Sequence, residues 1–137
     1  MLFRAKAFRS GLEKPCIIEC DDSLVPANGV YVVYGFVDPR TSDVFYVGQT
    51  CQFVKRMRKH VTQSEYNTPS LLPYRPQNVL NQRQAKIYAA GLYTQVVILS
   101  YAQDLQEAGS LEVQFIERYA QTVMNRSHGR EWRRKVE

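Results

Sequence analysis

The sequence lacks long apolar runs and has few cysteines. Its aliphatic runs, such as Val96 to Leu99, have the length of a strand, whereas a membrane-spanning helix needs about 20 apolar residues. The three cysteines form an odd set, which disfavours a disulfide framework and favours a reducing compartment. The first residues also lack the apolar core and cleavage site of a secretory signal. We therefore expect a cytoplasmic protein without membrane contact.

Acidic residues are scarce in two segments. The chain of 137 residues has 18 Lys and Arg against 13 Asp and Glu. Residues 52–60 hold no acid but contain Lys55, Arg56, Arg58 and Lys59, and residues 126–137 hold five basic residues against two acids. Clustered basic charge indicates a polyanionic partner, and the alternative is a solvated face with a frayed tail. The hydrophobic content of 45% predicts a folded chain.

The length predicts a single domain over residues 1–137, with an N-terminal extension at 1–28 and a basic tail at 126–137. Residues rich in β-branched and aromatic side chains predict strands, and apolar spacing of three to four residues predicts helices. We expect strands at 29–37, 44–48 and 93–99, a weaker strand at 16–20, and helices at 52–62, 77–90 and 110–124. The first two strands form a hairpin, and residues 64–77 form a long loop. The fold predicted is α+β, a small, mixed, mainly antiparallel β-sheet flanked by helices.

The last predicted helix contains an anomalous carboxylate. With Ser110 as its N-cap, the apolar side chains of this helix cluster on one face, and Glu112 falls near the centre of that face. A carboxylate directed at a sheet must be paired, hydrogen-bonded or bound to a metal ion. The alternative is that Glu112, in the first turn, only favours the helix N-terminus.

Arg56 and His60 lie four residues apart, so they share one face of the first predicted helix, at the border of its apolar stripe. Tyr31 and Tyr46 lie near the middle of the two hairpin strands. They share a face of the sheet if paired residue numbers sum to an odd value, such as 31 with 46. Taken singly, an arginine beside a core or a tyrosine in a strand is most often structural.

Together these residues resemble the GIY-YIG nuclease superfamily. Gly29-Val30-Tyr31 and Tyr46-Val47-Gly48 are similar to its paired signature, with valine for isoleucine in each half. Arg56 and His60 resemble the arginine and histidine of its first helix, Glu112 its metal-binding glutamate, and Asn125 the asparagine that closes the motif set. The resemblance covers residues 29–125.

The resemblance implies a metal-dependent endonuclease that hydrolyses DNA to 5′-phosphate and 3′-hydroxyl ends. Glu112 would hold Mg²⁺ (or Mn²⁺), Arg56 would neutralise the transition state, and Tyr31 would accept a proton from the attacking water. Tyr46 and His60 would orient that water or Tyr31. The residues with an implied structural role are Gly29, Gly48 and Asn125. We expect both hydroxyls in one cleft beside Arg56 and Glu112; the alternative function is a non-cleaving nucleic-acid-binding module on the same scaffold.

The expected partner is double-stranded or branched DNA, and a second copy of the chain or another protein could supply specificity. Basic side chains would contact the phosphates. The residues predicted for this role are Lys55, Arg58, Lys59, Arg83, Lys86, Arg130, Arg133 and Arg134.

Overall fold

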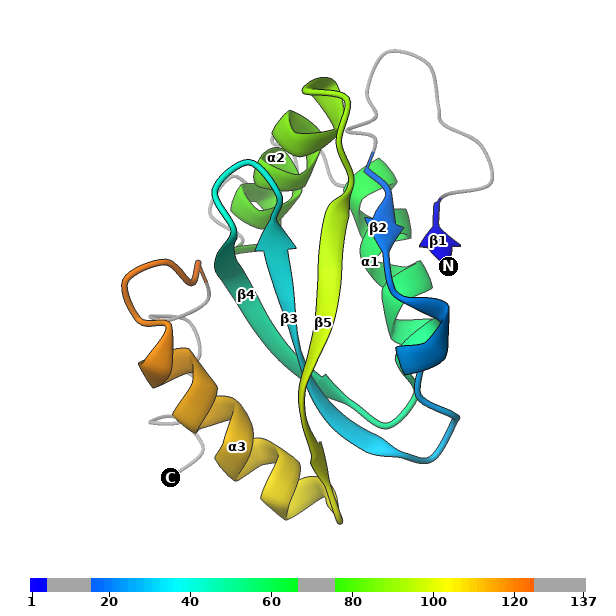
Figure 1. The fold of residues 1–137 in the computed structure, drawn as a ribbon, viewed down its shortest axis with the longest axis vertical. Helices are drawn as coiled ribbons and strands as arrows, with labels where there is room; N and C mark the ends of the chain where they lie inside the picture. The colour runs from blue at the N-terminus through cyan, green and yellow to red at the C-terminus, as the bar shows by residue number, and fades with distance from the viewer. Residues whose placement is uncertain (5–15, 67–75, 125–137) are drawn as a thin grey trace.

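The computed structural model describes residues 1–4, 16–66 and 76–124 and shows an α+β fold (Figure 1). One five-stranded sheet has the order β1-β2-β5-β3-β4. It is mixed, because β2 and β5 pair in parallel and the other neighbours are antiparallel. The predicted fold class is confirmed at this level. The elements are β1 (Leu2–Phe3), β2 (Ile18–Glu19), the short 3₁₀ helix η1 (Asp22–Leu24), β3 (Tyr31–Asp38), β4 (Asp43–Thr50), α1 (Phe53–Tyr66), α2 (Pro76–Ala89), β5 (Thr94–Ala102) and α3 (Leu105–Arg118).

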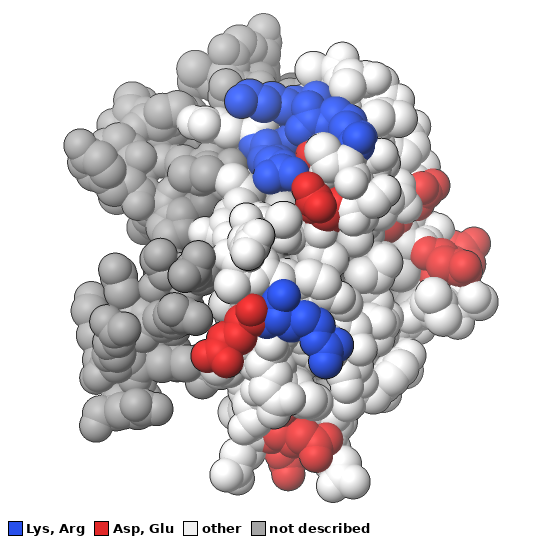
Figure 2. Space-filling model, turned by 60° about the vertical axis from the view of Figure 1, so that its left-hand side comes forward, with Lys and Arg blue, Asp and Glu red and all other residues white. Residues whose placement is uncertain are grey.

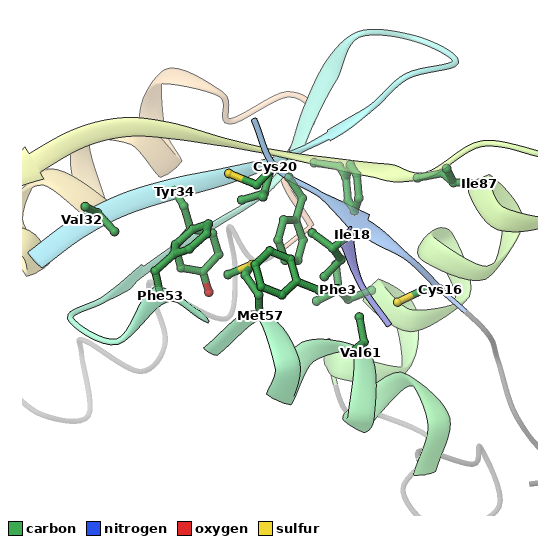
Figure 3. Close-up of a cluster of buried hydrophobic side chains, with 14 residues drawn as sticks. Phe3, Cys16, Ile18, Cys20, Val32, Tyr34, Phe53, Met57, Val61 and Ile87 are labelled. Carbon is green, nitrogen blue, oxygen red and sulfur yellow. The ribbon is translucent and has the colours of Figure 1, made fainter. Parts of the chain in front are cut away.

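The helices cover the two faces of the sheet unequally. On one face, α1 and α2 contribute Phe53, Met57, Val61, Leu80 and Ile87 to the larger core cluster, shown in Figure 3. On the opposite face, α3 packs on Val33, Val44 and Val47 through a smaller cluster that includes Ile116. No helix in the described ranges is long and apolar enough to cross a membrane.

A β-bulge in β4 determines which side chains of the hairpin share a face. Next to the turn, Asp38 pairs with Asp43 and Val37 with Val44, so the pair sums are odd. The register then shifts, and Phe36 pairs with Tyr46, which makes the sums even over the rest of the hairpin. The extra residue is Phe45, and a bulged residue can lie on the same side as its successor. Phe45 and Tyr46 both belong to the core cluster under α1 and α2.

The predicted register between Tyr31 and Tyr46 is therefore wrong. Tyr46 lies opposite Phe36, and alternation along β3 places Val32, Tyr34 and Phe36 on the same face as Tyr46. Tyr31 lies on the other face, with Val33. Paired residue numbers sum to an odd value only beside the turn. Beyond the bulge they sum to an even value, so the residues that share a face are different there.

The helix that carries Glu112 begins earlier than predicted. Asp104, not Ser110, is the N-cap of α3, and its carboxylate accepts a hydrogen bond of 2.8 Å from the Glu107 backbone N–H. The Glu107 carboxylate in turn accepts from the Gln103 N–H at 3.0 Å. This arrangement resembles a capping box, and it satisfies one free donor of the first turn and the N–H of the residue before the N-cap. Glu112 therefore lies in the interior of α3, and its placement has nothing to do with a helix N-terminus.

After α3 the chain is attached to the edge strand β4. The Thr122 hydroxyl donates to the Val44 carbonyl at 2.7 Å, and the Met124 N–H donates to the Phe45 carbonyl at 2.7 Å. These bonds occupy carbonyl groups at the bulge, so a segment about 78 residues further along the sequence helps to hold the bulge in place.

Candidate active site

The centre of the candidate site is Tyr34, which is fully buried and lies directly opposite Gly48. A Cβ atom built on Gly48 would lie 2.5 Å from the Tyr34 phenol oxygen and 2.6 Å from the ring carbon that bears it. The phenol thus occupies the space that a side chain would fill at position 48. Only glycine permits this approach, which gives the predicted structural role of Gly48 a physical reason.

His60 lies on α1, and its imidazole contacts the Tyr34 hydroxyl. Its Nε2 lies 2.8 Å from the Tyr34 oxygen, and the imidazole is only 4% exposed. The rings of Tyr34, Phe36 and Tyr46 meet the imidazole edge-on, with centroids 6.0, 4.9 and 5.5 Å away. Burial, followed by the positive charges of Arg56 and Lys59, lowers the pKa of His60 from 6.5 to about 3. The imidazole is therefore neutral at physiological pH.

Arg56 lies one helical turn before His60 and joins the two phenols. Burial acts to lower the pKa of its guanidinium, but interactions with Tyr34 and Tyr46, which include hydrogen bonding to both side chains, outweigh it and raise the pKa. The guanidinium is thus charged at every physiological pH. The predicted position of Arg56 and His60 on one helix face is confirmed, with His60 buried and Arg56 half-buried.

Both phenols are protonated at neutral pH. Burial raises the pKa of Tyr34 far above its ordinary value, with Tyr46 and Glu112 adding to the effect and Arg56 opposing it. Burial also raises the pKa of Tyr46, against the influence of Arg56 and with that of Glu112. A phenol of raised pKa keeps its proton at neutral pH, so it retains an O–H donor and does not serve as a general base there.

Glu112 acts on this cluster from the other side of the sheet. It is half-buried on α3, and its negative charge is close enough to affect the pKa of both Tyr34 and Tyr46. β4 is an edge strand of the sheet, and α3 packs on β4, β3 and β5 from the face opposite α1 and α2. The structure thus brings three of the five predicted catalytic residues, Tyr46, Arg56 and His60, into contact around Tyr34, which stands where Tyr31 was expected. Glu112 acts on this cluster through its charge.

The donor set fits a metal ion that keeps most of its water. Among the described residues, no three His, Cys, Asp or Glu side chains lie together as ligands, so no all-protein cage is formed by them. Glu112 offers one half-buried carboxylate whose charge reaches both phenols. Mg²⁺ is commonly bound in this way, through one or two carboxylates, water and substrate phosphate.

The predicted nucleic-acid contacts divide into three groups. Lys55, Arg58 and Lys59 are exposed on α1, and Lys86 is exposed in the last turn of α2. Arg83 is instead held by an ion pair with Asp38, which gives it a structural contact that the sequence did not suggest. The remaining predicted residues, Arg130, Arg133, Arg134 and the structural Asn125, lie outside the described residues. Gly29 has a φ of +90°, which favours glycine.

Comparison of the chain with protein-family models, with curated proteins and with solved structures finds no match.

Proposed function

We propose that the protein is a metal-dependent endonuclease that hydrolyses DNA phosphodiester bonds and leaves 5′-phosphate and 3′-hydroxyl ends. The observation that carries this proposal is the contact of one charged arginine, Arg56, with two phenols, the buried Tyr34 and the half-buried Tyr46, both of which feel the charge of Glu112. A permanent positive charge and a phenol hydroxyl that it contacts suit a phosphate group. Such a group gains negative charge density during hydrolysis.

Each residue of the site has a distinct part in this proposal. Arg56 donates to the non-bridging phosphate oxygens and offsets their charge in the transition state. Tyr34 and Tyr46 remain protonated. Tyr46, which is only half-buried, donates a hydrogen bond to the phosphate or to the attacking water. Tyr34 is fully buried and acts as a positioning residue: His60 fixes its hydroxyl through the 2.8 Å contact, so that Arg56 and Tyr46 are oriented before substrate binds.

Glu112 is the residue that would hold Mg²⁺ or Mn²⁺. When bound, such an ion lowers the pKa of a water ligand and polarises the phosphate. This assignment replaces the proton-accepting role expected for Tyr31, because neither phenol of the cluster ionises at neutral pH and Tyr31 lies on the other face of the sheet.

The exposed side chains of α1 extend the positive surface beyond the site. Lys55, Arg58 and Lys59 lie within one turn of Arg56, and all three are exposed to solvent. Phosphates on either side of the bound one would meet these charges, which supply affinity without reading sequence.

Plasmid cleavage tests the proposal. Supercoiled DNA is incubated with the wild-type protein in Mg²⁺, in Mn²⁺ and in EDTA, and the ends are analysed by enzymatic labelling. We expect metal-dependent nicks with 5′-phosphate ends, and a loss of at least 10²-fold in rate for Glu112→Gln with DNA affinity retained. DNA binding with no cleavage in either metal would leave only a binding module on this scaffold.

A further inference from the structure

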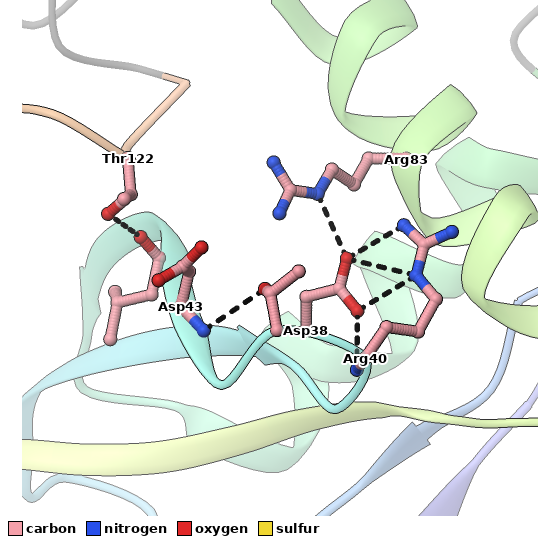
Figure 4. Close-up of polar contacts among 7 residues, drawn as sticks. Asp38, Arg40, Asp43, Arg83 and Thr122 are labelled. Atoms are coloured by element: carbon pink, nitrogen blue, oxygen red, sulfur yellow. Dashed lines mark hydrogen bonds and ion pairs between the residues drawn. The ribbon is translucent and has the colours of Figure 1, made fainter.

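A second cluster of charged side chains joins the hairpin turn to α2, outside the candidate active site. Asp38, the last residue of β3, is fully buried, and its carboxylate accepts hydrogen bonds from Arg40 and Arg83 (Figure 4). Arg40 also donates its backbone N–H to this carboxylate at 2.9 Å. The hydrogen bonds of Arg40 come first among the influences that lower the pKa of Asp38 to about 2. The buried Asp38 carboxylate therefore binds two positively charged guanidinium groups.

The two arginines use their donors differently. Arg40 directs both Nε and Nη2 at Asp38, at 3.0 and 2.8 Å, so this edge of its guanidinium is used by the carboxylate. Arg83 contacts Asp38 through Nε alone, at 3.1 Å. In Figure 4 the two terminal nitrogens of Arg83 point away from Asp38. Within the part of the chain that the structure describes, the hydrogen bond of the Arg83 guanidinium is the one from Nε to Asp38.

The orientation of the Arg83 guanidinium is fixed from a second direction. Its central carbon lies 4.8 Å above the centroid of the Phe45 ring, a cation–π distance. With one face on Phe45 and Nε on Asp38, the group presents its Nη edge, with two parallel N–H donors. This fork matches two oxygens of a phosphate.

The cluster lies next to the candidate active site. Phe45 immediately precedes Tyr46, and the bulge places both side chains on the face under α1 and α2. Lys86, one turn after Arg83, is exposed. In Figure 2, Lys and Arg side chains gather at the end of the molecule where α2 and the β3–β4 turn lie. A nucleic-acid strand bound at the active site could therefore continue over this end.

We propose that Arg83 binds a backbone phosphate of the nucleic acid beside the one that is cut, through its Nη edge, with Asp38 and Phe45 as positioning residues. This inference rests on the proposed function, because it assumes that a nucleic-acid strand passes the site. Arg40 holds Asp38 in place and does not contact the phosphate.

Two variants with the same change in charge test this assignment. Arg83→Gln and Arg40→Gln each remove one positive charge and one ion pair with Asp38, but only Arg83→Gln removes a guanidinium whose two terminal nitrogens are not used by Asp38. Binding to a short DNA duplex is measured by fluorescence anisotropy in EDTA over a range of salt concentrations. We expect Arg83→Gln to weaken binding about 10-fold or more and to lower the salt slope by about 0.9. For Arg40→Gln we expect a change of less than about 2-fold, and equal effects of the two variants would overturn the assignment.

Asp38→Asn separates orientation from charge. This variant raises the net charge by one unit, so a purely electrostatic patch would bind DNA more tightly. Loss of the carboxylate that orients Arg83 predicts weaker binding instead, and tighter or unchanged binding would contradict the proposal. Circular dichroism establishes that the variant is folded. If it is not, Arg83→Lys serves in its place, because it keeps the charge but loses the fork, and wild-type affinity of this variant would refute the proposal.

The failure of this inference is distinguishable from that of the proposed function. If the wild type cuts DNA and the two glutamine variants bind it equally, the Arg83 assignment is wrong and the nuclease proposal stands. If Arg83→Gln alone weakens binding but no metal supports cleavage, the phosphate contact stands and the nuclease proposal is wrong. If the wild type does not bind DNA, both are wrong.

Discussion

Replacing Gly48 by alanine adds one methyl group to the most crowded point of the candidate site. That methyl carbon would lie 2.5 Å from the Tyr34 oxygen and 2.6 Å from its ring carbon, distances at which non-bonded atoms repel strongly. An aromatic ring cannot bend out of the way, so either the Tyr34 ring turns or β3 and β4 move apart. Both movements break the 2.8 Å contact between Tyr34 and His60.

The expected loss of stability follows from these contacts. Overpacking of a core costs about 1–3 kcal/mol, and a buried donor or acceptor without its partner costs about 1–3 kcal/mol more. Alanine also lowers the backbone entropy of the unfolded chain, and this offsets about 0.5–1 kcal/mol of the lost stability. We therefore expect Gly48→Ala to lower the free energy of unfolding by roughly 2–5 kcal/mol, with a large loss of cleavage rate.

Urea unfolding followed by far-ultraviolet circular dichroism measures the first effect, and single-turnover cleavage the second. Gly35→Ala is the matched control, because it lies in β3 on the other face and the nearest atoms to its methyl group would be in the flexible side chains of Leu99 and Val44, at 3.2 Å. We expect it to cost less than about 1.5 kcal/mol. A Gly48→Ala variant with wild-type stability and wild-type rate would refute the placement of the Tyr34 ring.

Two further predictions concern charge. The pKa of His60 is lowered from 6.5 to about 3, so the unfolded chain binds a proton that the folded chain does not, and stability falls as the pH drops below 6.5. Between pH 6.5 and 5.0 His60 should account for a loss of about 1.5 kcal/mol, measured as the difference in urea unfolding between the wild type and His60→Gln; an identical pH dependence of both would contradict the buried neutral imidazole. Replacing Lys55, Arg58 and Lys59 together by glutamine should lower the salt slope of DNA binding by up to about 2.7, whereas an unchanged slope would place the DNA elsewhere.

Local sequence signals predicted β2 to β5 and the three α-helices, but they predicted neither β1, which lies in the expected N-terminal extension, nor the register of the β3–β4 hairpin. The strands and helices follow from β-branched runs and from helical spacing, which act over a few residues. The bulge at Phe45 depends on partners that lie far away in the sequence, since its carbonyl accepts from the Met124 N–H. No pattern within the hairpin sequence reveals that contact. The one extra residue in β4 changes which residues of β3 share a face with Tyr46, so Tyr34 occupies the position that was predicted for Tyr31.

One signal in the sequence did point to Tyr34. A glycine inside a strand often marks a close approach by another group, and Gly48 lies within β4 among larger residues. An aromatic residue across the hairpin from it is the natural occupant of that space. The start of α3 could also have been predicted from the sequence, because Asp104 and Glu107 have the spacing of a capping box. Gly109 and Ser110 instead suggested a helix start six residues too late.

The comparison of Tyr34→Phe with Tyr31→Phe tests the central claim most directly. Both variants remove one hydroxyl from β3, but only Tyr34 lies on the face that bears Tyr46, Arg56 and His60. Single-turnover cleavage of a DNA duplex in Mg²⁺ is measured for each variant beside the wild type. The account predicts a loss of about 10²-fold or more for Tyr34→Phe and a change of less than about 3-fold for Tyr31→Phe. A large loss for Tyr31→Phe with a wild-type rate for Tyr34→Phe would contradict it.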